Sequence, residues 1–248
     1  MLSQALIQPL LHLAIILPLL FFFLKERSRE NYLRVGSIIL CYYLCCTALY
    51  LPHLVDWLHI IDGKWNWNGK VYSILCGIAM YFAFRKQLND NDFFTLKQNK
   101  EGLKAGIKAA IAIFTFSVLP ILLAQQVEQL TIHKEFDPET LLFQLTMPGI
   151  DEEIFFRGIL LGLMCSTLRS GTSAWSNPAI IINATLFGLG HALRFYEGEA
   201  TFSTGVFIAT AISGYAFAYI AFKTRSLLIP ILTHNLCNFT KNLLWMFC

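Results

Sequence analysis

The sequence has little charge. Only 14% of its 248 residues are charged, against about 25% in an average soluble domain. Hydrophobic residues make up 56%, so too few polar side chains remain to cover the surface of a soluble enzyme. The same balance excludes a disordered chain, which needs low hydrophobicity and high net charge. A net charge of only +3 provides no basic surface for a nucleic acid, and a membrane protein remains.

The sequence also lacks the cysteine pattern of a secreted, disulfide-rich protein. Six of its seven cysteines lie within apolar segments and one ends the chain, so we predict free thiols that pack as small apolar residues. They are Cys41, Cys45, Cys46, Cys76, Cys165, Cys237 and Cys248.

Apolar runs long enough to cross a bilayer recur along the chain. One crossing needs about 20 mostly apolar residues, and the runs are continuous rather than alternating, so helices are predicted. We therefore expect an all-α, polytopic membrane helix bundle of about eight transmembrane helices, forming a single integral membrane domain over residues 1–248. The first run has no basic start and no small-residue cleavage site, so we expect it to be retained. The candidate spans are residues 4–24, 36–55, 71–84 (short), 106–124, 141–168, 178–193, 202–222 and 227–247.

Lysines and arginines are distributed unevenly between alternate loops. Basic loops stay in the cytoplasm, which predicts that both termini face outward. Short loops and the absence of a soluble domain suggest a microbial source, so we expect a prokaryotic inner or plasma membrane. The basic set of loops holds Lys25, Arg27, Arg29, Arg34, Arg85, Lys86, Lys97, Lys100, Lys104, Lys108, Arg169, Lys223 and Arg225. The opposite set holds only Lys64, Lys70, Lys134 and Arg194.

Ionisable residues interrupt the fifth span, where each is a candidate for function because charge is costly in a membrane. Pro148 and Gly149 predict a helix start just before three acids. Helical spacing makes Glu153 and Arg157 an i,i+4 ion pair. Glu152 points about 100° away and is left available for general-base chemistry. We expect Asp151 to be a solvated acid at the membrane interface.

Two further polar motifs lie in later spans. Phe187 and His191 stand four residues apart near the end of the sixth span, and His234 and Asn238 share one face of the eighth. Glu152 lies early in its span and His191 late in an antiparallel one, so both approach the outer side. His234 is about 12 Å into its helix at 1.5 Å per residue. The four polar groups are therefore predicted to converge in a cavity that opens outward.

These three motifs together resemble those of the CAAX-protease and bacteriocin-processing (CPBP) family of intramembrane proteases, which includes the type II CAAX prenyl endopeptidase. The resemblance covers about residues 140–245, while residues 1–125 show no motif. It implies a glutamate-dependent endopeptidase without a cofactor, in which Glu152 and His191 activate water and His234 and Asn238 stabilise the oxyanion. Glu153, Arg157 and Phe187 would support the site. The matching residues are Glu152-Glu153-x-x-x-Arg157, Phe187-x-x-x-His191 and His234-x-x-x-Asn238.

Other chemistries stay open. Glu152, His191 and His234 could be three zinc ligands of a metalloprotease, although no H-E-x-x-H motif is present. The chain could also be a non-catalytic scaffold or a bacteriocin-immunity protein, in which the polar groups only pack helices or bind a partner. A serine site at Gly171-Thr172-Ser173-Ala174 is disfavoured because this segment is a predicted loop. An aspartic intramembrane site is also disfavoured, because it needs a pair of membrane aspartates and Asp151 stands alone.

The substrate expected from the site's outward position is a membrane-associated or exported protein or peptide. Cleavage would occur at the outer boundary of the bilayer, in a C-terminal tail or a leader region. This position makes an isoprenyl-cysteine substrate doubtful, because the type II CAAX enzyme acts on prenylated tails from the cytosol.

Overall fold

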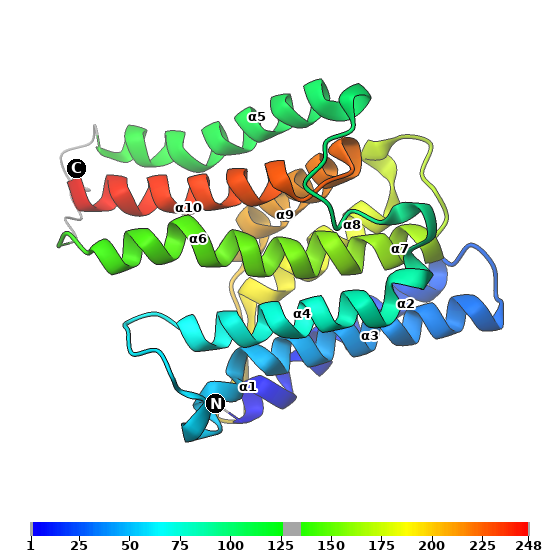
Figure 1. Ribbon diagram of the computed structural model, residues 1–248, viewed down its shortest axis with the longest axis horizontal. Coiled ribbons are helices and arrows are strands. Elements are labelled where there is room, and N and C mark those ends of the chain that lie inside the picture. Colours follow the sequence, from blue (N-terminus) through cyan, green and yellow to red (C-terminus); the bar gives the residue numbers. More distant parts are fainter. Residues whose placement is uncertain (1, 126–134, 248) are drawn as a thin grey trace.

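The structure, a computed structural model of the chain, describes residues 2–125 and 135–247. Within this part the helices form eight successive rods, several of which lie roughly side by side while others cross behind them (Figure 1). The rods confirm the all-α bundle. Four of them are individually long and apolar enough to cross a membrane, at Leu2–Phe22, Arg29–His53, Lys100–Ala124 and Thr204–Thr224.

The N-terminal rods begin at the residues that helix-capping rules favour. The first comprises α1 (Leu2–Leu6) and α2 (Gln8–Phe22). Ser28 then caps α3 (Arg29–Tyr50), and Asn66 caps α4 (Trp67–Leu88), because their side chains accept backbone N–H groups of the first turn. Short 3-10 turns at Leu51–His53, Asp56–Leu58 and Asn89–Asn91 connect these rods, and α5 (Lys100–Gln125) follows.

The fifth rod is the centre of the molecule. It runs without interruption through α6 (Pro138–Glu153), the π-helical segment η5 (Ile154–Leu160) and α7 (Leu161–Thr167). Asp137 caps it and Pro138 is its first residue, an arrangement typical of helix starts. The residues of η5 and α7 from Ile159 to Met164 are fully buried in the main hydrophobic core. The predicted helix start at Pro148-Gly149 is wrong, because Pro148 lies inside α6.

The remaining rods are α8 (Pro178–Ala192), α9 (Thr204–Thr224) and α10 (Leu228–Phe247), after a 3-10 turn at Ala174–Ser176. Between α8 and α9 the chain forms an antiparallel hairpin, β1 (Leu193–Tyr196) and β2 (Glu199–Phe202). Glu197 and Gly198 turn the hairpin with positive φ angles of 51° and 88°, as a tight two-residue turn requires. The sequence analysis did not predict this hairpin and assigned its ends to two spans.

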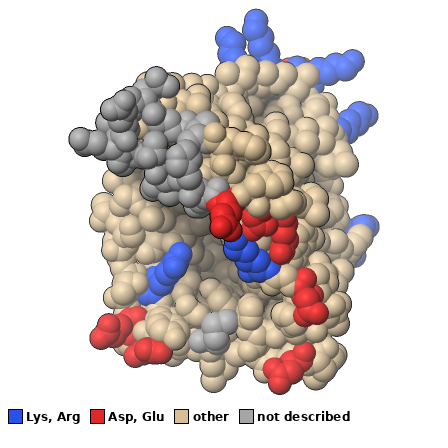
Figure 2. Space-filling view, turned by 90° about the vertical axis from the view of Figure 1, so that its left-hand side faces the viewer, with Lys and Arg blue, Asp and Glu red and all other residues tan. Residues whose placement is uncertain are grey.

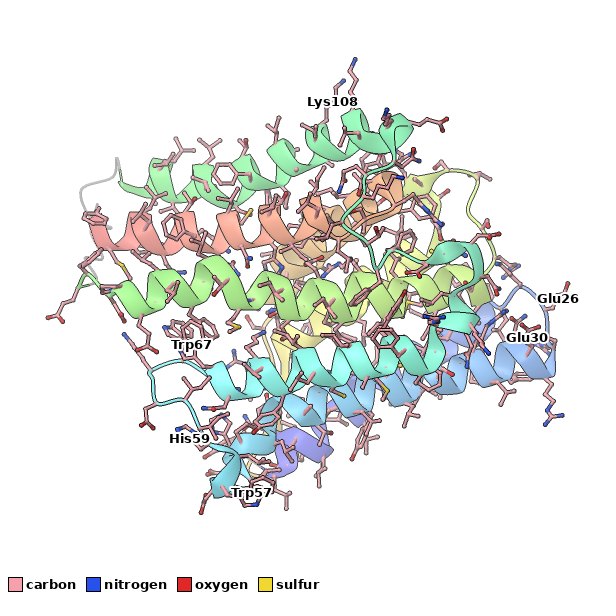
Figure 3. The ribbon with its side chains drawn as sticks, viewed as in Figure 1. Glu26, Glu30, Trp57, His59, Trp67 and Lys108 are labelled. Carbon is pink, nitrogen blue, oxygen red and sulfur yellow. The ribbon has the colours of Figure 1, made fainter. Side chains whose placement is uncertain are left out.

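The two ends of the bundle differ in their connections. The links α2–α3, α4–α5, α7–α8 and α9–α10, which together with the adjoining parts of their helices carry most of the basic residues, gather at one end (Figure 1). Glu26 and Glu30 lie at this end, whereas Trp57, His59 and Trp67 lie at the other (Figure 3). The alternation of loops that the charge pattern predicted is therefore a feature of the fold.

Candidate active site

The central rod carries two neighbouring glutamates that face different partners. Glu152 and Glu153 are the last residues of α6, directly before the π-helical turn. Such turns often occur at functional sites. The Glu153 side chain is 0% exposed and that of Glu152 is 17% exposed. The pair thus divides into a sealed carboxylate and one with access to a cavity.

Glu153 is the hub of a buried ion-pair network. Its Oε1 accepts from Arg157 Nη1 at 3.0 Å and from His234 Nδ1 at 2.8 Å. The predicted Glu153–Arg157 ion pair is therefore confirmed, with both side chains fully buried. A carboxylate placed in the interior needs such charged partners, and this one ties α6 and η5 to α10.

Arg157 is enclosed by backbone and aromatic groups. Its Nη2 donates to the carbonyl oxygen of Gly214 at 2.9 Å. Its guanidinium carbon lies 4.5 Å from the ring centre of Phe187 and 5.5 Å from those of Phe156 and Phe217. Flat cationic groups are stabilised on aromatic faces. Phe187, predicted as a supporting residue, therefore packs between this cation and the two histidine rings.

Glu152 faces three other charged or ionisable groups. Its Oε1 accepts from Lys70 Nζ at 2.8 Å. Its Oε2 lies 3.8 Å from His191 Nε2 and 3.9 Å from His234 Nε2, and this oxygen has no hydrogen-bond partner among the described residues. The structure thus brings together the glutamate and both histidines that the sequence singled out, from three different rods.

Asp151 and Lys70 depart from the sequence analysis. Asp151 is 4% exposed rather than solvated, and its Oδ2 accepts from Lys70 Nζ at 2.8 Å. Lys70 was counted as a loop lysine, yet it lies in the first turn of α4 and is itself buried. The sequence held a signal for this contact, because Lys70 directly adjoins an apolar run on the same predicted side of the membrane as the three acids.

The partners of the histidine rings define their tautomers. His191 Nδ1 contacts the Phe187 carbonyl oxygen at 2.9 Å, which only accepts, so Nδ1 carries the proton. His234 Nδ1 donates to Glu153 in the same way. Each ring therefore turns its Nε2 toward Glu152. Fixing one ring nitrogen so that the other can do chemistry is the usual arrangement at functional histidines.

Two asparagines of α10 have different surroundings. Asn235 donates to the Thr146 carbonyl at 3.1 Å and accepts from the Gly149 N–H at 2.7 Å, so it clamps α10 to α6. A side chain on Gly149 would collide with this amide, which explains the glycine. The side chain of Asn238 forms no hydrogen bond to a described residue and lines a cavity with Glu152, His191 and His234. Asn238 was predicted from the sequence as a site residue, whereas Asn235 was not.

Two cavities meet at Glu152 and His191, which line both of them. We call the first, of about 140 Å³, the apolar chamber, and its walls include Tyr42, Cys45, Cys46, Leu49, Phe155 and Phe156. The second, of about 150 Å³, is the polar chamber, and its walls include Ser117, Thr210, Ser213, His234, Asn238 and Lys241. At the end of the bundle that carries Trp67, Figure 2 shows a hollow where acidic and basic side chains lie together.

Other sequence candidates do not join this arrangement. Ser173 caps the 3-10 turn that ends at Ser176 and lines a separate surface pocket with Lys25 and Arg225. The six cysteines that the structure describes are free thiols, as predicted. Across residues 2–125 and 135–247, no group of three His, Cys, Asp or Glu side chains is arranged to hold a metal ion.

The fold and the buried carboxylate–histidine cluster define a helical membrane protein with a polar centre inside its bundle. A family model described as "Type II CAAX prenyl endopeptidase Rce1-like" matches residues 137–240. The match supports the assignment of this region to the CAAX protease family that its motifs indicated, a family of membrane proteases. Among curated proteins and solved structures, none matches the chain.

Proposed function

We propose that this chain is an intramembrane endopeptidase of the glutamic type. The observation that carries the proposal is the position of Glu152 Oε2, 3.8 Å from His191 Nε2 and 3.9 Å from His234 Nε2. These distances exceed a direct hydrogen bond. One water molecule at hydrogen-bond distance can bridge Glu152 and His191, donating one proton to each acceptor.

Such a water would be activated for attack on a peptide carbonyl. Glu152 or His191 takes one proton as the water oxygen bonds to the carbonyl carbon, and the carbonyl oxygen becomes an oxyanion. The Asn238 amide would donate to that oxyanion, and His234 would do so whenever it carries a proton on Nε2 as well as on Nδ1. The proton held by the base then passes to the leaving nitrogen as the C–N bond breaks.

The decisive variant is Glu152→Gln, which keeps size and removes the base. A loss of activity of at least about 100-fold is expected from general-base catalysis. The measurement compares protein termini in membrane and secreted fractions of cells carrying wild type or variant. Termini unique to the wild type identify substrates. If the variant is inserted normally and its termini and phenotype are unchanged, the chain is a scaffold or immunity protein.

The proposed mechanism needs no cofactor, because Glu152 and His191 hold the water themselves. The rival is a zinc-dependent protease that uses Glu152, His191 and His234 as ligands. Activity of the purified protein should survive treatment with 1,10-phenanthroline. Loss of activity that only zinc restores would favour the rival.

We further propose that the site opens to the outer side and that a membrane-associated or exported substrate enters there, presenting a C-terminal tail or a leader region. The supporting observation is that the basic connections lie at the opposite end of the bundle (Figure 1), and basic loops stay in the cytoplasm. A Gly198→Cys variant should react with an impermeant maleimide in intact cells, and Asp90→Cys should not. The reverse labelling would contradict this orientation and readmit a cytosolic prenylated tail as the substrate.

A further inference from the structure

Lys70 joins the site from the half of the chain that lies outside the family match. Its ammonium donates to Asp151 Oδ2 and to Glu152 Oε1, both at 2.8 Å. The Lys70 side chain is only 11% exposed. A buried cation is stable only when its partners are well placed, so these two contacts define a specific position rather than a surface ion pair.

The chain around Lys70 fixes the start of α4. Asn68 accepts the backbone N–H groups of Ile60 and Ile61 and donates to the carbonyl of Ile61. Asn66 caps the helix and donates to the carbonyl of Leu49. These bonds lock the loop before α4 onto α4 itself and onto α3. Lys70 follows directly and is held beside α6.

This geometry gives the two oxygens of Glu152 different tasks. Lys70 anchors Oε1, so Oε2 is left facing His191 and His234. A cation at hydrogen-bond distance also favours the ionised carboxylate, which is the form that a general base requires. Asp151 supplies the second negative charge that keeps the Lys70 ammonium from being left unpaired when Glu152 takes a proton.

We propose that Lys70 is a positioning residue that holds Glu152 ionised and aims its free oxygen at the histidines, with Asp151 as its counter-charge. The inference rests on the proposed role of Glu152 as base. It assigns the N-terminal half of the chain a part in the reaction.

Among the charged groups around Glu152, Lys70 has the strongest influence on its ionisation. The Lys70 ammonium lies 2.8 Å from the Glu152 carboxylate, whereas Nε2 of His191 and of His234 lie 3.8 and 3.9 Å away. Coulombic effects weaken with distance. The other ionisable groups that face this region are Asp151, Glu153 and Arg157 on the central rod, Lys241 and Cys237 on α10, and Tyr42, Cys45 and Cys46 on α3.

The test uses the double variant Lys70→Met/Asp151→Asn in the full chain, reconstituted in nanodiscs. The pair of changes removes the bridge and leaves the net charge of the trio unaltered. The kcat of the double variant should fall about 100-fold, which is the effect of a misplaced catalytic group, and its KM should change little. The acid limb of the pH–rate profile should move to higher pH. Activity is read with a quenched fluorescent peptide spanning a cleavage site found from the protein termini.

A substrate-independent measurement accompanies the kinetics. The Glu152 carboxylate band is identified in infrared spectra by subtracting the Glu152→Gln spectrum. The midpoint of its titration should shift to higher pH in the double variant. Lys70→Arg should restore most of the rate and the titration. Wild-type kcat and titration in the double variant would overturn the proposal. If the double variant does not insert, Lys70→Gln keeps a donor without the charge, and wild-type behaviour there overturns it equally.

Failure of this proposal is distinguishable from failure of the proposed function. If Glu152→Gln keeps full activity, Glu152 is not the base, whatever Lys70 does. If Glu152→Gln is inactive while the Lys70 variants behave as wild type, only the role of Lys70 is wrong.

Discussion

At the scale of single residues, the two adjacent glutamates have different surroundings. Glu153 is sealed between Arg157 and His234, whereas Glu152 borders both chambers. Two neighbouring residues of one helix point in different directions, so the motif places one acid in the packing and one in the cavity. Substitutions at the two positions should therefore fail for different reasons.

Arg157→Met is expected to destabilise the fold. It leaves the carboxylate of Glu153 buried without its cation, and breaking a buried pair in this way costs about 3–5 kcal/mol. The measurement is unfolding of the purified protein in mixed micelles titrated with SDS. Glu152→Gln is the matched control and should unfold close to wild type. Equal stability of Arg157→Met and wild type would contradict the structural role of the pair.

At the scale of elements, the contact between α6 and α10 sets the geometry of the site. Asn235 bonds the backbone of α6 at Thr146 and at Gly149. His234, the preceding residue, is thereby held against Glu153. The distance between the rods, and with it the position of His234 beside Glu152, depends on this clamp.

Asn235→Ala and Asn238→Ala form a matched pair on one helix. Asn235→Ala leaves the Gly149 N–H without its acceptor, at a cost of about 1–3 kcal/mol, so SDS unfolding should occur at lower denaturant. Asn238→Ala should leave unfolding unchanged and lower kcat, because its amide faces the polar chamber. If Asn238→Ala proved the less stable variant, the assignment of clamp and cavity residue would be reversed.

The elements also show what the sequence could predict. Three short motifs singled out Glu152, His191 and His234, and the structure brings these side chains together, because helical spacing and span direction determine which side chains can meet. Pro148 led to a wrong prediction of a helix start. A long buried helix can keep an internal proline when neighbouring helices pack around it. Lys70 was missed because a lysine beside an apolar run is usually an interfacial residue, and only the tertiary fold places its acidic partners.

At the scale of the whole molecule, a set of polar contacts, which we call the strap, links two elements at the end of the bundle near the site. It joins the loop before α4 to the start of α6 through the Lys64–Asp137 ion pair at 2.8 Å. Glu139 extends it by accepting from the Lys64 N–H at 2.8 Å and from Trp67 Nε1 at 2.9 Å. Trp67 thus links the helix that carries Lys70 to the helix that carries Glu152 (Figure 3).

The strap should loosen in acid. The Lys64 ammonium, and then Thr140, lower the pKa of the Asp137 carboxyl, so its contribution is fully present above the ordinary carboxyl pKa of about 3.9. This contribution is lost as the pH falls through the lower folded value. Hydrogen exchange of residues 60–66 in nanodiscs should be slower in wild type than in Asp137→Asn at neutral pH, and the difference should shrink below about pH 4. An unchanged difference in acid would contradict this.

The distribution of the site over α4, α6, α8 and α10 has a consequence for biosynthesis. The ribosome releases these helices in order, and His234 arrives only with α10, after the central rod has entered the bilayer. Until then Glu153 lacks its partner on α10, and the proposed oxyanion donors His234 and Asn238 are missing. On the proposed mechanism, the nascent chain is inert while it is being inserted, and competence for cleavage arises only when its last helix docks.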